Sequence, residues 1–100
     1  MENLFVYGTL KNHDVQNKVI GRIVNGKPDS LRGFRKSLIT LNNKEYPIII
    51  EDQKSTSAIE GLVLELSEEE LKKTDEYEGD AYRRQMIMLN SGLKAWVYTR

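Results

Sequence analysis

Four acidic residues, Asp75, Glu76, Glu78 and Asp80, cluster at the point in the chain where a helix is expected to end. The carbonyl end of a helix is its negative pole, so lysine or arginine would stabilise it better than carboxylates do. We therefore interpret this cluster as serving chemistry rather than helix stability. The helix dipole is expected to raise the pKa of Glu78, which suits a carboxyl group that exchanges protons near neutral pH. The alternative is a solvated acidic helix end in a polar loop.

The helix that positions these acids has start and stop signals in the sequence. Ser67 fits the N-cap and Glu70 fits the third helical position, which together form a capping box for two backbone N–H groups. Gly79 is expected to end the helix in a left-handed conformation. Because a helix turns about 100° per residue, Glu78 shares the face of Leu71, seven residues earlier. Glu78 should therefore point toward the body of the protein.

The composition restricts the side chains that could carry out a reaction. The chain has 100 residues, no cysteine and a single histidine, His13. Thiol nucleophiles and thiolate metal sites are thereby excluded, and a Ser-His-Asp triad or a multi-histidine metal site is disfavoured. His13 lies in a polar stretch and is interpreted as a surface residue. Catalysis is therefore expected to depend on carboxylates, hydroxyls and backbone groups, without a metal ion or cofactor.

The charge balance argues against a general nucleic-acid partner. Fifteen Lys and Arg residues match fifteen Asp and Glu residues, whereas nucleic-acid-binding domains are usually basic. No apolar run is long enough to span a bilayer, and residues 1–3 lack the basic region of a secretory signal. We expect one domain over residues 1–100, a cytoplasmic location and no membrane partner. The sequence does not indicate an oligomeric state.

Most of the remaining chain is predicted to form strands. Apolar or alternating runs predict them at residues 4–7, 21–24, 35–41, 46–50, 58–66, 84–89 and 93–98. Residues 11–20 fit a short helix and residues 25–29 fit a turn. Pro47 indicates an edge strand, and Gly61 indicates a bulge or a close backbone approach. Several strands are apolar on both faces, so we expect an α+β fold with a curled, mostly antiparallel, barrel-like β-sheet and one main α-helix.

Two short motifs stand at opposite ends of the chain: Val-Tyr-Gly-Thr-Leu at residues 6–10 and Asp-Glu-Tyr-Glu-Gly at residues 75–79. In this order and at this separation they resemble the gamma-glutamylcyclotransferase-like family, also called AIG2-like. The resemblance covers nearly the whole chain. It implies a small-molecule gamma-glutamyl substrate that is cyclised to 5-oxoproline with release of an amine.

The resemblance also implies roles for individual residues. Glu78, just before the glycine of the second motif, takes the position of the general acid/base. The first motif corresponds to a loop whose backbone holds the substrate, and its residues here are Tyr7, Gly8, Thr9 and Leu10. The family reaction needs no nucleophilic side chain, because the α-amino group of the substrate attacks the γ-carbonyl of the same molecule. That chemistry agrees with a chain that has no cysteine.

Tyrosines are further candidates for the pocket. Tyr7, Tyr82 and Tyr98 could supply hydroxyl donors to a substrate; alternatively, each ring packs in the wall while its hydroxyl group reaches water. Tyr82 is included among the expected substrate-binding residues. Arg83 is expected either to pair with a carboxylate at the helix end or to lie on a strand edge.

Two functions are compatible with this pattern. The first is a cyclotransferase, and the second is a non-catalytic small-molecule binding protein that uses the same pocket. Glu78 favours the enzyme, because a binding site for an anionic substrate gains little from an added acid. The sequence does not identify the leaving amine.

Overall fold

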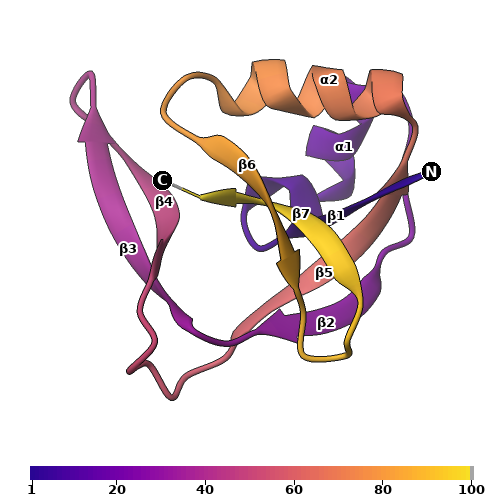
Figure 1. The fold of residues 1–100 in the computed structure, drawn as a ribbon. Coiled ribbons are helices and arrows are strands. Elements are labelled where there is room, and N and C mark those ends of the chain that lie inside the picture. Colours follow the sequence, from indigo (N-terminus) through magenta and orange to yellow (C-terminus); the bar gives the residue numbers. More distant parts are fainter. Residues whose placement is uncertain (100) are drawn as a thin grey trace.

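The computed structural model describes residues 1–99, which form seven strands, two α-helices and one turn of 3-10 helix (Figure 1). The strands are β1 (Glu2–Val6), β2 (Lys27–Leu31), β3 (Phe34–Leu41), β4 (Lys44–Glu51), β5 (Ile59–Leu66), β6 (Arg83–Met88) and β7 (Lys94–Thr99). The helices are α1 (His13–Ile20) and α2 (Glu68–Glu78), and the 3-10 turn is η1 (Thr9–Lys11). Neither α-helix in this part of the chain is long and apolar enough to cross a membrane.

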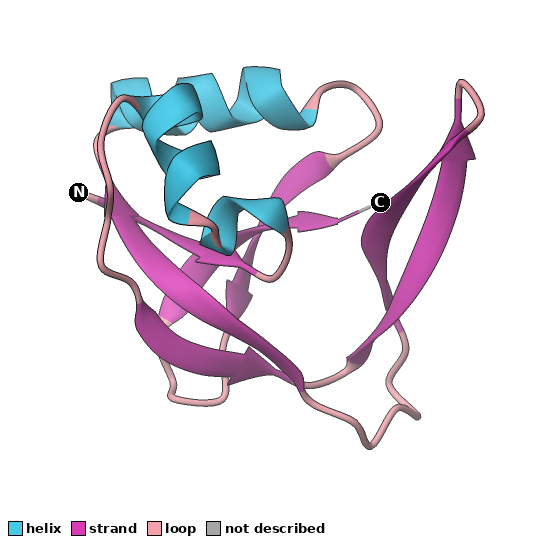
Figure 2. Cartoon of the chain, turned by 180° about the vertical axis from the view of Figure 1, so that it is seen from behind, coloured by secondary structure: helices cyan, strands magenta, loops and turns pink. Residues whose placement is uncertain are grey.

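Five of the strands form a mixed sheet in the order β2-β5-β1-β7-β6. Neighbouring strands are antiparallel, except that β1 and β7 are parallel. β3 and β4 form a separate antiparallel ribbon, which stands to one side of the five-stranded sheet (Figures 1 and 2). The α+β class and the mostly antiparallel pairing are confirmed. The expected barrel is not closed within residues 1–99, because the ribbon pairs with neither β2 nor β6, the two edges of the sheet.

Both faces of the five-stranded sheet bury apolar side chains. The first face packs beneath the helices (Figure 1) and buries Leu4, Val6, Leu10, Ile20, Val24, Leu64, Leu66, Leu71 and Tyr98. The second face packs with residues of the β3–β4 ribbon and buries Phe5, Leu31, Phe34, Ile49, Ile59, Val63, Leu89, Ala95 and Val97. Because successive side chains of a strand point to opposite faces, the continuous apolar run of β1 supplies both cores.

The segment after α1 differs from the sequence-based prediction of a strand at residues 21–24. Gly21 is instead the left-handed C-cap of α1, with φ 82° and ψ 8°. The backbone N–H of Val24 donates to the side-chain oxygen of the buried Gln16 at 2.8 Å. The Gln16 side chain thus provides the hydrogen bond that the N–H of Val24 would otherwise need from a neighbouring strand.

The predicted turn at residues 25–29 is also wrong in large part, because β2 begins at Lys27. Asn-Gly and Pro-Asp are common in turns, but here Pro28 lies within a strand. β2 is an edge strand, and an edge position tolerates a residue without a backbone N–H. The predicted edge position of Pro47 is confirmed, since β4 belongs to a ribbon of two strands.

Gly61 of β5 confirms the predicted close backbone approach. A Cβ atom at this position would clash with the carbonyl oxygen of Val6 and would lie 2.7 Å from Cζ of Phe5. All five residues of β1 pair with β5, and Val6 is opposite Leu62, so the Val6 carbonyl group cannot withdraw without disturbing the ladder. The backbone contact therefore requires glycine here.

Candidate active site

Glu78 is positioned by helix α2, whose two ends are both fixed by local interactions. Its start is the predicted capping box, in which Ser67 accepts from the backbone N–H of Glu70 at 3.1 Å and Glu70 accepts from that of Ser67 at 2.9 Å. Arg22 donates to Glu70 at 2.6 Å and lowers the pKa of that carboxyl group to about 2. Glu78 is the last helical residue, and Gly79 follows with φ 74° and ψ −171°. The positive φ agrees with the prediction. The ψ value, however, places Gly79 outside the predicted left-handed helical region, in a region that essentially only glycine occupies.

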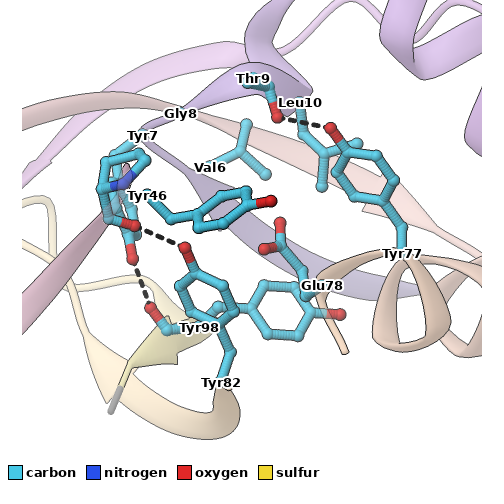
Figure 3. A pocket seen from close by; sticks show the side chains of 11 residues that line it. Val6, Tyr7, Gly8, Thr9, Leu10, Tyr46, Tyr77, Glu78, Tyr82 and Tyr98 are labelled. Carbon is cyan, nitrogen blue, oxygen red and sulfur yellow. Dashed lines mark hydrogen bonds between the residues drawn. The ribbon is translucent and has the colours of Figure 1, made fainter. Parts of the chain in front are cut away.

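The two sequence motifs meet at one pocket of about 220 Å³. Every predicted site residue lines it: Tyr7, Gly8, Thr9, Leu10, Glu78 and Tyr82. In Figure 3 the carboxyl group of Glu78 points from the end of α2 into this space. The hydroxyl groups of Thr9 and Tyr77 lie 2.8 Å apart and join the first motif directly to the second. The structure thus brings together all six residues, although their roles stay predictions.

The environment of Glu78 is dominated by aromatic rings. Tyr46, Tyr77, Tyr82 and Tyr98 surround it in Figure 3, and no lysine or arginine of the described chain lines the pocket. Burial among these rings raises the pKa of Glu78 to about 7, because a charged carboxylate is poorly solvated there. The direction of the predicted pKa shift is confirmed. The cause is different, since the expectation rested on the helix dipole and the structure attributes the shift to burial.

The predicted hydroxyl donors are already engaged within the protein. Tyr7 donates to the backbone carbonyl of Tyr98 at 2.7 Å, and Tyr82 donates to that of Pro47 at 2.6 Å. The hydroxyl of Tyr98 donates to Asp75 at 2.6 Å. Burial raises the pKa of both the Tyr7 and the Tyr98 hydroxyls, so both stay protonated at neutral pH. The rings of all three tyrosines line the pocket, and donation of their hydroxyl groups to a substrate stays a prediction.

Backbone groups are the better candidates for substrate binding. Within residues 1–99, no hydrogen bond has the N–H of Gly8, Thr9 or Leu10 as its donor, while the carbonyl groups of Gly8 and Thr9 accept from Lys11 and Asn12. These three N–H groups lie in the loop that lines the pocket. Clustered backbone N–H groups of this kind can hold a carboxylate or a developing oxyanion without a cationic side chain.

Gly8 is expected to matter for binding rather than for folding. An added Cβ would meet only Cγ of Pro47, at 4.0 Å, so a methyl group fits there without a clash. Because Gly8 and Pro47 both line the pocket, the extra methyl group would narrow the binding space. We expect Gly8→Ala to change the melting temperature little and to weaken binding of 5-oxoproline by about tenfold, as measured by calorimetry. Equal affinity in the two proteins would contradict a close approach of ligand at Gly8.

Sequence reasoning did not assign four lining residues to the pocket: Val6, Tyr46, Pro47 and Tyr77. Tyr46 and Pro47 come from β4, and Tyr77 comes from the last turn of α2. Tyr46 and Pro47 were not assigned to the pocket, because only tertiary folding brings the ribbon to this site. Tyr77 could have been found from the Asp-Glu-Tyr-Glu-Gly motif, in which it precedes Glu78. In the described part of the chain, no three His, Cys, Asp or Glu residues form a cluster that could hold a metal ion.

Comparisons with known proteins identify the family of this chain. Residues 4–100 match the family described as gamma-glutamyl cyclotransferase, AIG2-like. The chain therefore belongs to the gamma-glutamyl cyclotransferase, AIG2-like family.

Two similar curated proteins are AIG2-like protein C and AIG2-like protein B of Arabidopsis thaliana. They are 33% and 31% identical to this chain over 86 and 88 residues, which is 85% and 87% of its length. The same alignments cover 48% and 49% of the two relatives. The chain thus spans about half the length of the curated relatives it matches.

Solved structures show the same fold. Two solution structures of Arabidopsis thaliana proteins each superpose on 98% of this chain with a TM-score of 0.80. Their sequences are 25% and 29% identical to this chain, and the superpositions include 61% and 67% of their own residues. A crystal structure of an uncharacterised protein from Pyrococcus horikoshii superposes on 99% of this chain with a TM-score of 0.63. That chain is covered to 77% and is 20% identical, so it supports the fold alone.

Proposed function

We propose that this protein is a gamma-glutamyl cyclotransferase-like enzyme that converts a gamma-glutamyl amine or dipeptide into 5-oxoproline and a free amine. The observation that carries the proposal is the place of Glu78, a half-buried carboxyl group with a pKa of about 7, in the pocket formed with the loop of the first motif. A general acid/base works best when its pKa lies near the working pH. Family membership supports the class of reaction.

The proposed reaction uses the substrate as its own nucleophile. The α-amino nitrogen attacks the γ-carbonyl carbon, a new C–N bond closes the five-membered lactam, and the C–N bond to the leaving amine breaks. Glu78 accepts protons from the α-nitrogen and returns them to the leaving nitrogen, so it ends each cycle in its starting state. The enzyme needs to fold the substrate, exclude water and move protons, which are tasks that this pocket can perform without a nucleophilic side chain.

The N–H groups of Gly8, Thr9 and Leu10 are the proposed donors to the anionic parts of the reacting molecule. The α-carboxylate is charged throughout, and the γ-carbonyl oxygen becomes negative in the tetrahedral intermediate. Donors fixed before the reaction stabilise this developing charge without reorganising. Because no lysine or arginine within residues 1–99 lines the pocket, we assign this task to the backbone.

Activity should rise with pH through about 7. Below this value Glu78 is mostly protonated and cannot accept a proton from the α-nitrogen, so kcat/KM should fall about tenfold per pH unit. The measurement is kcat/KM between pH 5 and pH 8.5, with enzyme stability checked at each pH. A profile that is flat from pH 5 to pH 8 would contradict proton transfer by Glu78.

The direct test is incubation with a panel of gamma-glutamyl amino acids and gamma-glutamyl amines, with 5-oxoproline detected by mass spectrometry. Release of 5-oxoproline from at least one compound is the expected result. Binding of these compounds without any release would overturn the enzyme assignment and identify a non-catalytic binding protein.

A further inference from the structure

Asp75 lies one helical turn before Glu78, and its carboxylate joins three elements of the fold. Oδ1 accepts a hydrogen bond from the hydroxyl of Tyr98 on β7 at 2.6 Å. The guanidinium of Arg84 on β6 contacts both carboxylate oxygens, with Nε 3.0 Å from Oδ1 and Nη2 donating to Oδ2 at 3.1 Å. The Tyr98 hydroxyl also lies 2.7 Å from that of the buried Thr74. The end of α2 is therefore tied to two neighbouring strands.

This ion pair places a positive charge near the negative end of helix α2. The last turn of α2 contains no basic residue, although cations stabilise the negative pole of a helix. Arg84 brings a cation to this end from another element and stacks over the ring of Trp96, 4.3 Å from its centroid. About a quarter of the Arg84 side chain is exposed, so the pair is partly shielded from water. Such a pair is less screened by solvent and salt than an exposed one.

Tyr98 connects the pair to the pocket. Its ring lines the pocket that holds Glu78, while its hydroxyl binds Asp75 on the far side. Its backbone carbonyl accepts from Tyr7, which also lines the pocket. Neither Asp75 nor Arg84 lines that pocket. The two residues can thus affect Glu78 only through the position of α2 and through their charges.

We propose that Asp75 and Arg84 are positioning residues for Glu78: the pair anchors the last turn of α2 and keeps the charge of Asp75 from acting on the Glu78 carboxyl group. The catalytic part of this inference rests on the proposed function of Glu78. The electrostatic part does not, because it concerns the proton affinity of one carboxyl group in the folded protein.

The titratable groups that line the pocket with Glu78 are tyrosines. They are Tyr7 from the loop after β1, Tyr46 from β4, Tyr77 from α2, Tyr82 from the segment after α2, and Tyr98 from β7. No lysine, arginine or second carboxylate of the described chain lines the pocket, so nothing charged within it competes with the effect of the Asp75–Arg84 pair.

The sign of the electrostatic effect follows from the two charges of the pair. Asp75 is half-buried and lies behind the Tyr98 ring, whereas the neighbouring acids Glu76 and Asp80 are exposed to water, which screens them. Loss of the Arg84 cation would expose Glu78 to the uncompensated Asp75 carboxylate and raise the pKa of Glu78. Loss of the Asp75 charge would leave the cation and lower that pKa.

The test is a titration of Glu78 by ¹³C NMR of the side-chain carboxyl carbon, compared with the pH profile of kcat/KM. Arg84→Met keeps the apolar stem of the side chain over Trp96 and removes the charge. We expect it to shift the titration of Glu78 upward by roughly half a pH unit. Asp75→Asn, which can still accept from Tyr98, should shift it downward by a similar amount. The double variant should return the midpoint to that of the wild type.

Arg83→Met is the matched control, because Arg83 is exposed, lies next in sequence and forms none of the ion pairs among residues 1–99. It should leave the midpoint unchanged. Unchanged midpoints in folded Arg84→Met and Asp75→Asn proteins would overturn the proposal and leave the pair a purely structural contact. If Arg84→Met does not fold, Asp75→Asn alone decides the outcome. Shifted midpoints in a protein that produces no 5-oxoproline would support the coupling and refute the proposed function.

Discussion

Replacing Glu78 by glutamine is expected to lower turnover by about 10²–10⁴-fold, which is the usual contribution of a general acid/base. Glutamine has nearly the same shape as glutamate and keeps hydrogen-bonding groups, but it cannot accept and return a proton. Binding of 5-oxoproline should therefore change much less than the rate. The measurement is kcat on whichever gamma-glutamyl compound the wild type converts, together with the Kd for 5-oxoproline.

The same variant should be more stable than the wild type at pH 8. The folded pKa of Glu78 is about 7, against 4.5 for an exposed glutamate, so the folded state binds more protons between these values. The free energy of unfolding of the wild type therefore falls as pH rises from 4.5 to 7. One pKa unit corresponds to about 1.4 kcal/mol, and partial exposure of the group reduces the whole effect to about 2 kcal/mol.

Urea denaturation at pH 4.5 and pH 8 measures this gain. The stability advantage of Glu78→Gln should be near zero at the lower pH and largest at the higher one. Glu76→Gln is the matched control, because Glu76 is exposed two residues earlier and should show neither the rate loss nor the pH-dependent gain. Full activity in the Glu78→Gln protein would end the assignment of Glu78 as the proton carrier.

The second large effect is expected at Gly61, where alanine should destabilise the protein by about 3 kcal/mol. Overpacking usually costs about 1–3 kcal/mol, and the upper end applies here because the clash is with the backbone carbonyl of Val6. A flexible side chain could move away, but a paired strand cannot. The measurement is the free energy of unfolding in urea.

Gly8→Ala is the control for this prediction, since a Cβ at Gly8 meets no atom closer than 4.0 Å. A cost below about 1 kcal/mol for Gly61→Ala would mean that β1 and β5 can separate locally without losing their pairing. The contrast between the two substitutions separates a glycine needed for strand packing from one that borders the pocket.

Local signals predicted the elements that carry the site. The capping box of α2, its glycine stop and the inward orientation of Glu78 all follow from residues within one helix length, so the sequence could specify them directly. β1 and the turn after it were predicted for the same reason. Errors occurred at residues 21–29, where the Gln16 side chain and an edge-strand position decided the conformation instead of turn propensity.

Only the tertiary structure decided the environment of Glu78. Its raised pKa comes from burial among rings supplied by several separate elements, and burial depends on contacts between residues far apart in sequence. The same reason explains why Arg84, rather than Arg83, pairs with Asp75. Successive side chains of β6 point to opposite faces, and only the position of β6 in the sheet decides which of the two arginines faces the helix. The sequence alone determined which acid enters the pocket; the packing of β4, β7 and α2 determined its proton affinity.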